Sequence, residues 1–154
     1  MKVLITGGAG YIGSHFVKIL NENNTEVVVL DNLSRGHKEA VPNNVKLENV
    51  DLLDYQNLDK VFQNQYFDAV VHFAAFAYVG ESVENPSQYY ENNVVGSYNL
   101  LKACIQNNVK KFVFSSTCSL YGNPEIIPIS ENQKTNPINP YAQTKLIIEN
   151  MLKD

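Results

Sequence analysis

The sequence predicts an α/β protein built on a doubly wound parallel sheet. Short apolar runs rich in β-branched residues alternate with longer segments of helical character, which is the pattern of strands joined by helical crossovers. A cluster of glycines follows the first run directly. The length of 154 residues, with 44% apolar side chains, suits one compact domain spanning residues 1–154. Right-handed crossovers then predict the strand order 3-2-1-4-5.

Five runs are predicted to form the strands of this sheet. They are KVLIT at residues 2–6, EVVVL at 26–30, VKLENV at 45–50, FDAVVHFAA at 67–75 and KKFVFSS at 110–116. Each is short and bounded by polar or turn-forming residues, as strands of a globular domain are. The sheet is therefore expected to use most of the first 116 residues.

Two helices and one long loop complete the expected architecture. A helix is predicted between Pro86 and Gln106, and its apolar residues at helical spacing should pack on the sheet. The residues of this stripe are Val94, Tyr98, Leu101 and Ile105. Four prolines between residues 121 and 140 predict a loop over the carboxyl edge of the sheet, and a helical pattern resumes at Tyr141.

Composition narrows the class of partner. The net charge of −4 and the absence of a basic run argue against an electrostatic grip on nucleic acid or anionic lipid, so a small-molecule partner is favoured. Cys104 and Cys118 are the only cysteines, and no Cys-x-x-Cys or His pair has the spacing of a metal site. No stretch approaches the ~20 apolar residues of a membrane helix. These observations predict a soluble, cytoplasmic protein without a metal.

The glycine cluster, GGAGYIG at residues 7–13, is the strongest local signal. Gly8, Gly10 and Gly13 match G-x-G-x-x-G, and Gly7, Gly10 and Gly13 match G-x-x-G-x-x-G. Between a strand and a helix, such a turn lets the backbone approach a pyrophosphate that the helix amino terminus binds. A flexible turn is the alternative, but the βαβ context favours dinucleotide binding.

Acidic residues after the second and third strands extend this hypothesis. Asp31 can accept hydrogen bonds from an adenosine ribose and repel a 2′-phosphate, which favours NAD over NADP. Arg35 leaves NADP open, since it could pair with that phosphate, and Asp31 could also serve only to cap the strand end. Asp51 is a candidate acceptor for the adenine amino group, and Asp54 a candidate helix N-cap.

The fourth and fifth strands should frame the rest of the cofactor site. Ligands of open α/β sheets bind beyond the carboxyl ends of the strands, at the switch in strand order. The small side chains of Ala74 and Ala75 would let the cofactor approach there. His72 precedes them within an apolar strand, where a hydrogen-bonded core histidine is the more common outcome.

The pair Tyr141 and Lys145 is a candidate catalytic unit. Residues at i and i+4 share a helix face, so the lysine ammonium can stand near the phenol and favour its phenolate, which then acts as a general base. Ser115, Ser116 and Thr117 end the fifth strand and supply hydroxyls. A second match, Tyr98 with Lys102, lies within the earlier helix, where Tyr98 is expected simply to pack.

Together these motifs resemble the extended short-chain dehydrogenase/reductase family. The segments that carry the resemblance are TGGAGYIGSH, LDNLSRG, VVHFAAFAYVGESVENPSQYYENNV, FVFSST and YAQTK. Within that family the chain is most similar to enzymes that interconvert UDP-glucose and UDP-galactose in galactose metabolism. The resemblance implies an NAD(P)-binding Rossmann-like fold and a recycled NAD that takes hydride from the sugar 4-position and returns it to the opposite face.

The resemblance also implies roles for individual residues. Tyr141 would be the base, Lys145 would polarise it and bind the nicotinamide ribose, and Thr117 would hold the reacting sugar hydroxyl. Family cofactor contacts correspond here to Gly7, Gly10, Tyr11, Ile12, Gly13, Asp31, Asn32, Ser34, Asp51, Leu52, Phe73, Ala74, Ala75, Asn92, Tyr141 and Lys145. Ala77 departs from relatives with lysine there. Cys118 and Ser119 replace the Asp-Glu pair of related dehydratases, which disfavours loss of water.

Length is the largest departure from the family. Its members are about twice as long and add a carboxyl-terminal domain for the UDP-sugar, so the chain is expected to be an amino-terminal NAD-binding portion with little or no activity alone. Full-length relatives commonly form homodimers. The open alternatives are 4-epimerisation of a UDP-pentose, UDP-uronate or N-acetylated UDP-sugar, and a non-catalytic dinucleotide-binding module.

Overall fold

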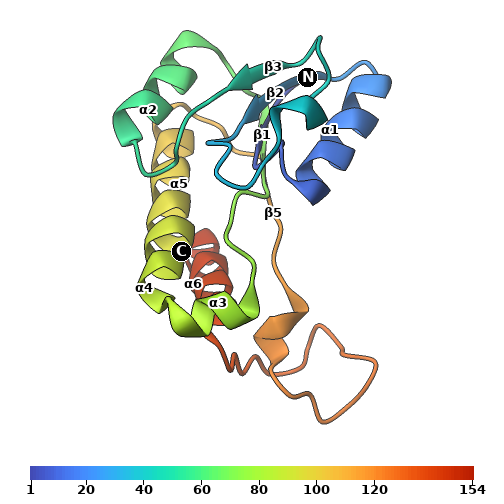
Figure 1. Cartoon of the computed structure of the whole chain (residues 1–154), viewed down its shortest axis with the longest axis vertical. Helices are drawn as coiled ribbons and strands as arrows, with labels where there is room; N and C mark the ends of the chain where they lie inside the picture. Colours follow the sequence, from blue (N-terminus) through green and yellow to red (C-terminus); the bar gives the residue numbers. More distant parts are fainter. The chain divides into compact units, whose positions relative to one another are not determined.

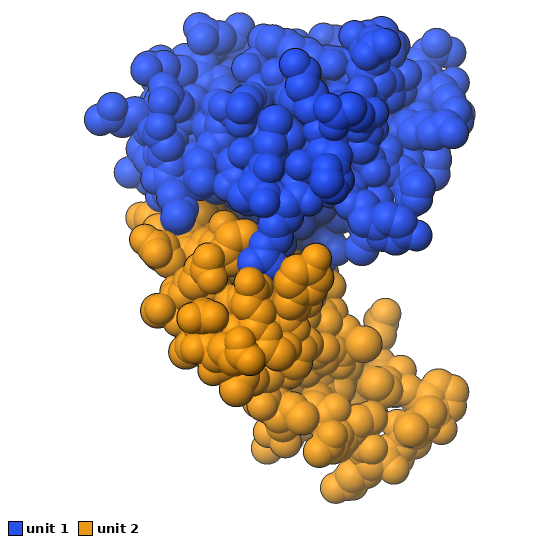
Figure 2. Space-filling model, in the orientation of Figure 1, with its two compact units in different colours: residues 1–75, 99–115 blue, residues 76–98, 116–154 orange.

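The computed structural model describes all 154 residues, which form two compact units (Figure 2). Unit 1 contains residues 1–75 and 99–115, and unit 2 contains residues 76–98 and 116–154. None of the helices combines the length and the apolar character needed to cross a membrane.

Unit 1 is built on a five-stranded sheet whose strands are all parallel. Its order is β3-β2-β1-β4-β5, which confirms the predicted order and doubly wound class (Figure 1). The register pairs Val3 of β1 with Val27 of β2 and with Ala69 of β4. The strands are β1 (Lys2–Thr6), β2 (Glu26–Leu30), β3 (Lys46–Glu48), β4 (Ala69–His72) and β5 (Phe112–Phe114).

Both faces of this sheet are covered, as expected for a parallel sheet. Successive residues of β1 point to opposite faces: Leu4 belongs to the core cluster with α2 (Tyr55–Asn64) and α5 (Gly96–Gln106). Val3 and Ile5 belong to the cluster with α1 (Tyr11–Glu22). Each fully buried aliphatic side chain stabilises the fold by about 1.5–3 kcal/mol. The strands therefore hold their carboxyl ends in fixed positions.

The helix starts follow local capping signals, with one exception. Asp54 accepts a hydrogen bond from the Asn57 N–H at the start of α2, which confirms its predicted N-cap role. Asn139 accepts from the Ala142 N–H at the start of α6 (Pro140–Lys153), as predicted near Tyr141. Helix α1 begins after Gly10 without any side-chain cap. The α1 amino terminus is thus left open.

Unit 2 is helical. It contains α3 (Val79–Glu84), α4 (Pro86–Tyr89), the π-helix η2 (Tyr90–Val95), the first residues of α5, the 3₁₀ turn η3 (Cys118–Tyr121) and α6. Helices α3 and α4, the π-helix and η3 all pack against α6. The helix predicted between Pro86 and Gln106 is therefore a run of three segments, with a π turn in its middle.

The predicted packing stripe of this helix was wrong. Tyr98 is 55% exposed and Ile105 is 76% exposed. The row one residue earlier is buried instead, at Asn93, Ser97, Leu100 and Cys104, and Ala103 is buried beside it. A step of one residue turns a helix by about 100°. The pattern failed because two of the four buried positions are polar, whereas the stripe had been chosen by apolar character alone.

Residues 122–139 form the predicted loop, with no helix or strand. The Ile127–Pro128 peptide bond is cis. Gly122 has a φ of +60°, and a Cβ there would lie 2.2 Å from the Asn136 carbonyl oxygen. The Asn136 N–H in turn donates to the Leu120 carbonyl at 2.8 Å. The base of the loop is therefore pinned by backbone contacts.

Candidate functional site

The glycine turn joins β1 to α1 as predicted. Gly7 has a φ of +70°, and a Cβ there would lie 2.5 Å from the Ala74 N. A Cβ on Gly13 would lie 2.2 Å from the Gly7 carbonyl oxygen, which also accepts the Gly10 N–H at 3.1 Å. Backbone packs on backbone at both positions, so no side chain fits. This turn therefore requires glycine at positions 7 and 13, whereas a Cβ on Gly10 would lie 3.3 Å from the Gly7 carbonyl oxygen.

The amino terminus of α1 has no side-chain cap. In an α-helix the first N–H groups have no intrahelical partner, and here no side chain caps them and no acidic residue lies in the first turn. Tyr11 and Ile12 are 83% and 60% exposed on this turn. The helix dipole adds positive potential at this end. The turn therefore fits a pyrophosphate, as the sequence predicted.

Asp31 follows β2 and is 8% exposed. Its Oδ2 accepts the Ala9 N–H of the glycine turn at 3.0 Å, and its Oδ1 accepts the Leu33 N–H at 2.9 Å. The His37 N–H returns to the Ala9 carbonyl at 2.9 Å. Asp31 thus ties the loop after β2 to the turn after β1. Each carboxylate oxygen keeps a second lone pair with which it can accept a ribose hydroxyl.

Three of the predicted cofactor contacts, Asn32, Ser34 and Asp51, are linked by hydrogen bonds beyond β2 and β3. Asn32 Nδ2 donates to Asp51 Oδ2 at 2.8 Å, and Asp51 Oδ1 accepts the Leu53 N–H at 2.8 Å. The other side of the Asn32 amide, Oδ1, accepts from the Ser34 N–H at 3.0 Å and from the Ser34 hydroxyl at 2.7 Å. Asp51 is therefore oriented before any ligand arrives.

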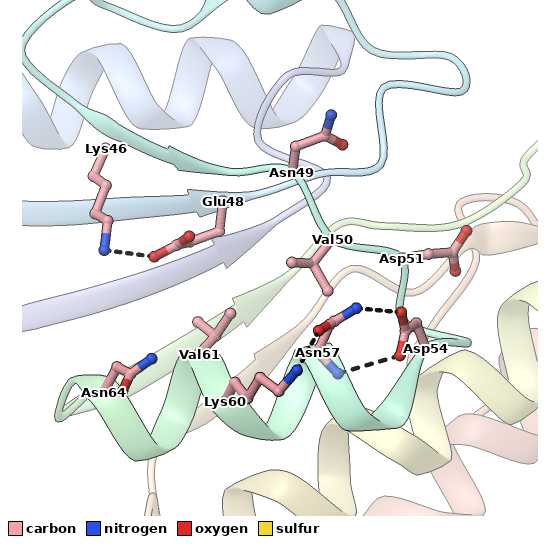
Figure 3. Close-up of a pocket in the computed structure, with 10 residues that line it drawn as sticks. All are labelled: Lys46, Glu48, Asn49, Val50, Asp51, Asp54, Asn57, Lys60, Val61 and Asn64. Atoms are coloured by element: carbon pink, nitrogen blue, oxygen red, sulfur yellow. Dashed lines mark hydrogen bonds and ion pairs between the residues drawn. The ribbon is translucent and has the colours of Figure 1, made fainter.

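A polar groove of about 450 Å³ runs between β3 and α2 (Figure 3). Its side chains bond mainly to one another: Lys46 pairs with Glu48 at 2.6 Å, and Asn57 bonds both Asp54 and Lys60. Asp51 stands at one end with its carboxylate turned away from Asp54 and Asn57. The groove side chains are thus mostly bonded to one another, and Asp51 is the lining residue that the groove shares with the predicted cofactor contacts.

Phe73, which follows β4, and Leu52 both place their side chains in or against the core. The Phe73 ring meets the Phe16 ring edge-on, with centroids 5.5 Å apart, and packs on the core beside α1. Leu52 is also buried in the core. Contacts from these two positions to a cofactor would therefore come from the main chain. His72 is 1% exposed and lies 2.6 Å from the Thr6 hydroxyl, which confirms a hydrogen-bonded core histidine.

The pair Tyr141 and Lys145 lies on one face of α6. Lys145 is 3% exposed, and its Nζ stands 6.0 Å from the centroid of the Tyr141 ring. Burial lowers the pKa of Lys145 to about 8, which leaves most of the amine charged at pH 7. A buried lysine beside a tyrosine is unlike the surface pair that chance would give. Position and charge therefore support a joint role.

The second Tyr-x-x-x-Lys match does not form such a pair. Tyr98 was expected to pack in the core, yet it is 55% exposed. Lys102 instead lies over the Tyr55 ring, with its Nζ 4.3 Å from the ring centroid. The sequence spacing alone did not separate the two matches, whereas burial of the lysine does.

Other predicted residues of unit 2 lie around α6. Thr117 is half-buried and caps η3, with its hydroxyl oxygen accepting the Ser119 N–H at 3.2 Å. Because η3 packs on α6, Thr117 is held in the same unit as Tyr141. Asn92 Nδ2 donates to the neighbouring Asn93 Oδ1 at 2.9 Å. Ala77 and Cys118, which depart from the resemblance, are both exposed.

Sequence reasoning missed two buried polar residues beside the candidate pair. Asn93 and Thr144 are both fully buried, and Asn93 Nδ2 donates to the Thr144 hydroxyl oxygen at 3.1 Å. The Thr144 hydroxyl donates to the Tyr141 carbonyl at 2.7 Å. The only signal in the sequence is that Thr144 lies between Tyr141 and Lys145.

The turn, the open helix terminus and the two carboxylates define unit 1 as a dinucleotide-binding α/β fold. The sequence profile of the NAD dependent epimerase/dehydratase family matches residues 3–154. The chain belongs to this family, as its resemblance to extended short-chain dehydrogenases/reductases indicated.

Individual relatives are similar over almost the whole chain. A UDP-glucose 4-epimerase of Halalkalibacterium halodurans is 52% identical over 151 residues, which are 98% of this chain and 45% of that relative. The crystal structure of UDP-glucose 4-epimerase from Brucella ovis in complex with NAD superposes with a TM-score of 0.96 at 49% identity, covering 99% of this chain and 47% of that one. The UDP-Glc/GlcNAc 4-epimerase of Campylobacter jejuni gives a TM-score of 0.96 at 46% identity, covering 99% of this chain and 48% of that one. The chain thus spans just under half the length of these relatives.

Proposed function

We propose that this chain is the NAD-binding part of a UDP-glucose 4-epimerase. The observation that carries the proposal is the joint presence of the glycine turn in unit 1 and of a buried lysine beside Tyr141 in unit 2, at 52% identity to an epimerase of that name. NAD, when bound, would accept hydride from the sugar 4-position and give it back. The net reaction is an isomerisation.

The residues of unit 1 would hold the cofactor. The open N–H groups at the start of α1 bind the pyrophosphate, and Asp31 accepts from the adenosine ribose. The oriented carboxylate of Asp51 accepts from the adenine amino group. A 2′-phosphate near Asp31 would meet a like charge, so NAD is preferred over NADP.

The residues of unit 2 would move the proton. Tyr141 takes the proton from the sugar 4-hydroxyl as hydride leaves, and returns it when hydride comes back. The Lys145 ammonium, held 6.0 Å from the Tyr141 ring centroid, favours negative charge on the phenol. Thr117 donates to or accepts from the same sugar hydroxyl and orients it. Lys145 also binds the nicotinamide ribose.

Titration calorimetry of the 154-residue chain with NAD and with NADP tests the binding part of the proposal. We expect saturable binding of NAD and at least tenfold weaker binding of NADP. Asp31→Asn removes the charge and keeps one of the two acceptor oxygens, so it gives up one bond to the Ala9 or Leu33 N–H. It should narrow this preference. Absence of NAD binding, or tighter binding of NADP, would reject the assignment of unit 1.

A chimera tests the catalytic part. Residues 1–154 are joined to the remaining half of the Halalkalibacterium halodurans relative, and interconversion of UDP-glucose and UDP-galactose is followed. We expect turnover that Tyr141→Phe lowers by about 10²–10⁴-fold, the usual contribution of a general base. A chimera that binds NAD and keeps full turnover with Tyr141→Phe would instead support the non-catalytic dinucleotide module.

One solved relative points to a second class of UDP-sugar. A relative named for UDP-Glc and UDP-GlcNAc is nearly as similar as those named for UDP-glucose alone. A 4-epimerase of an N-acetylated UDP-sugar is therefore the second candidate. The other half of the chimera is that of the Halalkalibacterium halodurans relative. Activity of the chimera toward UDP-N-acetylgalactosamine, beside that of the intact relative, therefore reports what residues 1–154 contribute to the choice of sugar.

We further propose that the protein pairs with a second copy through the helical segment 90–105. This segment exposes apolar side chains to solvent, namely Tyr90 at 38%, Val95 at 47%, Tyr98 at 55% and Ile105 at 76%. Association would remove them from water. Sedimentation analysis should find a dimer that Tyr98→Glu dissociates. The matched control is Tyr66→Glu, since Tyr66 is 67% exposed and lies in the connection between α2 and β4.

A further inference from the structure

Thr144 occupies an unusual place for a helix hydroxyl. It lies between Tyr141 and Lys145 in α6, and it is fully buried rather than facing solvent. Threonine is a mediocre helix former, and a buried hydroxyl without a partner would cost about 1–3 kcal/mol. We therefore expect the Thr144 hydroxyl to have hydrogen-bond partners, both as a donor and as an acceptor.

The first partner is the helix itself. The Thr144 hydroxyl donates to the Tyr141 carbonyl oxygen at 2.7 Å. In an α-helix the same carbonyl accepts from the N–H four residues on, which here belongs to Lys145. The Thr144 hydroxyl thus bonds the same carbonyl oxygen that the Lys145 N–H bonds in the helix, so it lies at the backbone link between Tyr141 and Lys145.

The second partner is Asn93 of the π-helix, which packs on α6. Asn93 donates from Nδ2 to the Thr144 oxygen at 3.1 Å and to the Phe76 carbonyl at 3.0 Å. Its Oδ1 accepts the Phe76 N–H at 2.8 Å and Asn92 Nδ2 at 2.9 Å. All hydrogen-bonding groups of this buried amide are used, so Asn93 has no freedom to turn.

We propose that Thr144 is a positioning residue, which links the first turn of α6 to the immobile Asn93 amide and thereby fixes how Tyr141 and Lys145 are presented. This inference rests on the catalytic role proposed above for that pair. The link acts through the backbone, because neither hydrogen bond of Thr144 touches the Tyr141 ring or the Lys145 amine. Without it, the hydrogen bond that joins the first turn of α6 to Asn93 is lost, whereas the Asn139 cap remains.

Burial of Lys145 supplies the readout. Desolvation lowers the pKa of this amine to about 8. A turn that loosens admits water, and water moves the titration of the amine back toward the ordinary value of a lysine, about 10.4. The Lys145 titration midpoint therefore reports the position of the turn, which global stability does not.

The test follows this titration in the 154-residue chain by NMR of lysine labelled with ¹³C at Cε. Lys145→Arg identifies the signal. In Thr144→Val, which keeps the shape and removes the hydroxyl, we expect the midpoint to rise by about 1 pH unit. Thr144→Ser keeps the hydroxyl, so its Lys145 titration midpoint should stay within about 0.2 pH unit of the parent value.

A matched control separates position from stability. Ser82 is also fully buried, and its hydroxyl donates to the Val79 carbonyl three residues back in α3, at 2.6 Å. Ser82→Ala removes a similar bond within α3, a helix that also packs on α6, and leaves both hydrogen bonds of Thr144 in place. It should therefore lower stability and leave the Lys145 midpoint unchanged. Equal midpoints in Thr144→Val and the parent, or equal shifts in Thr144→Val and Ser82→Ala, would overturn the proposal.

A replacement variant and a separate binding measurement complete the test. If Thr144→Val does not fold, Thr144→Ala replaces it, because the higher helix propensity of alanine offsets part of the loss. The same midpoint shift is expected, and its absence overturns the proposal. NAD binding is measured separately on every variant. A failure of NAD to bind the parent chain rejects the proposed function, whereas the Lys145 titration alone decides the role of Thr144.

Discussion

Gly13→Ala is the sharpest test of the glycine turn, because the structure gives its effect a sign opposite to ordinary helix propensity. Alanine is favoured over glycine by about 1 kcal/mol within a helix. At this position, however, the new Cβ would lie 2.2 Å from the Gly7 carbonyl oxygen and 2.9 Å from Gly8 Cα. Ordinary contact begins near 3.4 Å. One of the two backbone segments must therefore move by about 1 Å.

The expected cost follows from that displacement. Forcing a methyl group into packed surroundings costs about 1–3 kcal/mol, and backbone on the far side places this case at the upper end. After subtraction of the propensity gain, unit 1 should lose about 2 kcal/mol. The same 1 Å movement carries the amides of the turn out of hydrogen-bond range of a pyrophosphate, so NAD affinity should fall at least tenfold, about 1.4 kcal/mol.

The matched control is Gly80→Ala in α3. Nothing lies within 4 Å of a Cβ there, so only the propensity gain applies. Urea denaturation should show Gly80→Ala to be slightly more stable than the parent and Gly13→Ala less stable, and calorimetry should find NAD binding weakened only in Gly13→Ala. A Gly13→Ala variant with the parent's denaturation midpoint and an unchanged NAD affinity would refute the reasoning.

Three further predictions concern buried groups. Because the pKa of Lys145 is about 8 in the fold and 10.5 is its ordinary value, the unfolded chain binds more protons between these pH values, and the parent gains stability as pH rises through them. The stability advantage of Lys145→Met over the parent should therefore shrink by about 3 kcal/mol from pH 7 to pH 10.5, as pH-dependent urea melts will show; a constant difference contradicts this. Burial raises the pKa of the Cys104 thiol to about 12, whereas Cys118 is exposed. A thiol reagent should therefore label Cys118 alone until urea is added. Labelling of both cysteines in the native protein would count against the fold. Thr6→Val removes the buried partner of His72 and should cost about 1–3 kcal/mol in denaturation, with Thr6→Ser close to the parent; a neutral Thr6→Val would show that water replaces the hydroxyl.

The parallel sheet and its order could be predicted from the sequence because each strand is a short apolar run with turn residues at its ends. The glycine turn was equally predictable, since Gly7 and Gly13 each exclude a side chain by backbone contact. Asp54 was identified as a cap because the N-cap bond is local, to the N–H three residues on. Features set by neighbours in sequence were the ones that pattern reasoning found.

The buried face of the helical segment 90–106 could not be found in this way. Apolar character favoured the row that includes Tyr98 and Ile105, which the structure exposes. The buried row contains Asn93 and Ser97, and Asn93 is accommodated by partners far away in sequence, at Phe76 and Thr144. Hydrogen bonds over such separations leave no periodic signal. For the same reason no sequence pattern marks the bond of Thr144 to Asn93, although Thr144 lies between Tyr141 and Lys145.

Asn93 also changes how the chain can leave the sheet. Phe76 follows β4, and both its N–H and its C=O bond the single carboxamide of Asn93. Two residues of adjacent antiparallel strands exchange the same pair of bonds through their peptide groups. A helix side chain therefore stands in for a neighbouring strand, and it bonds both backbone groups of Phe76 after the end of β4. Only a carboxamide presents a donor and an acceptor as a peptide does, so neither a carboxylate nor a hydrocarbon of the same shape can replace it.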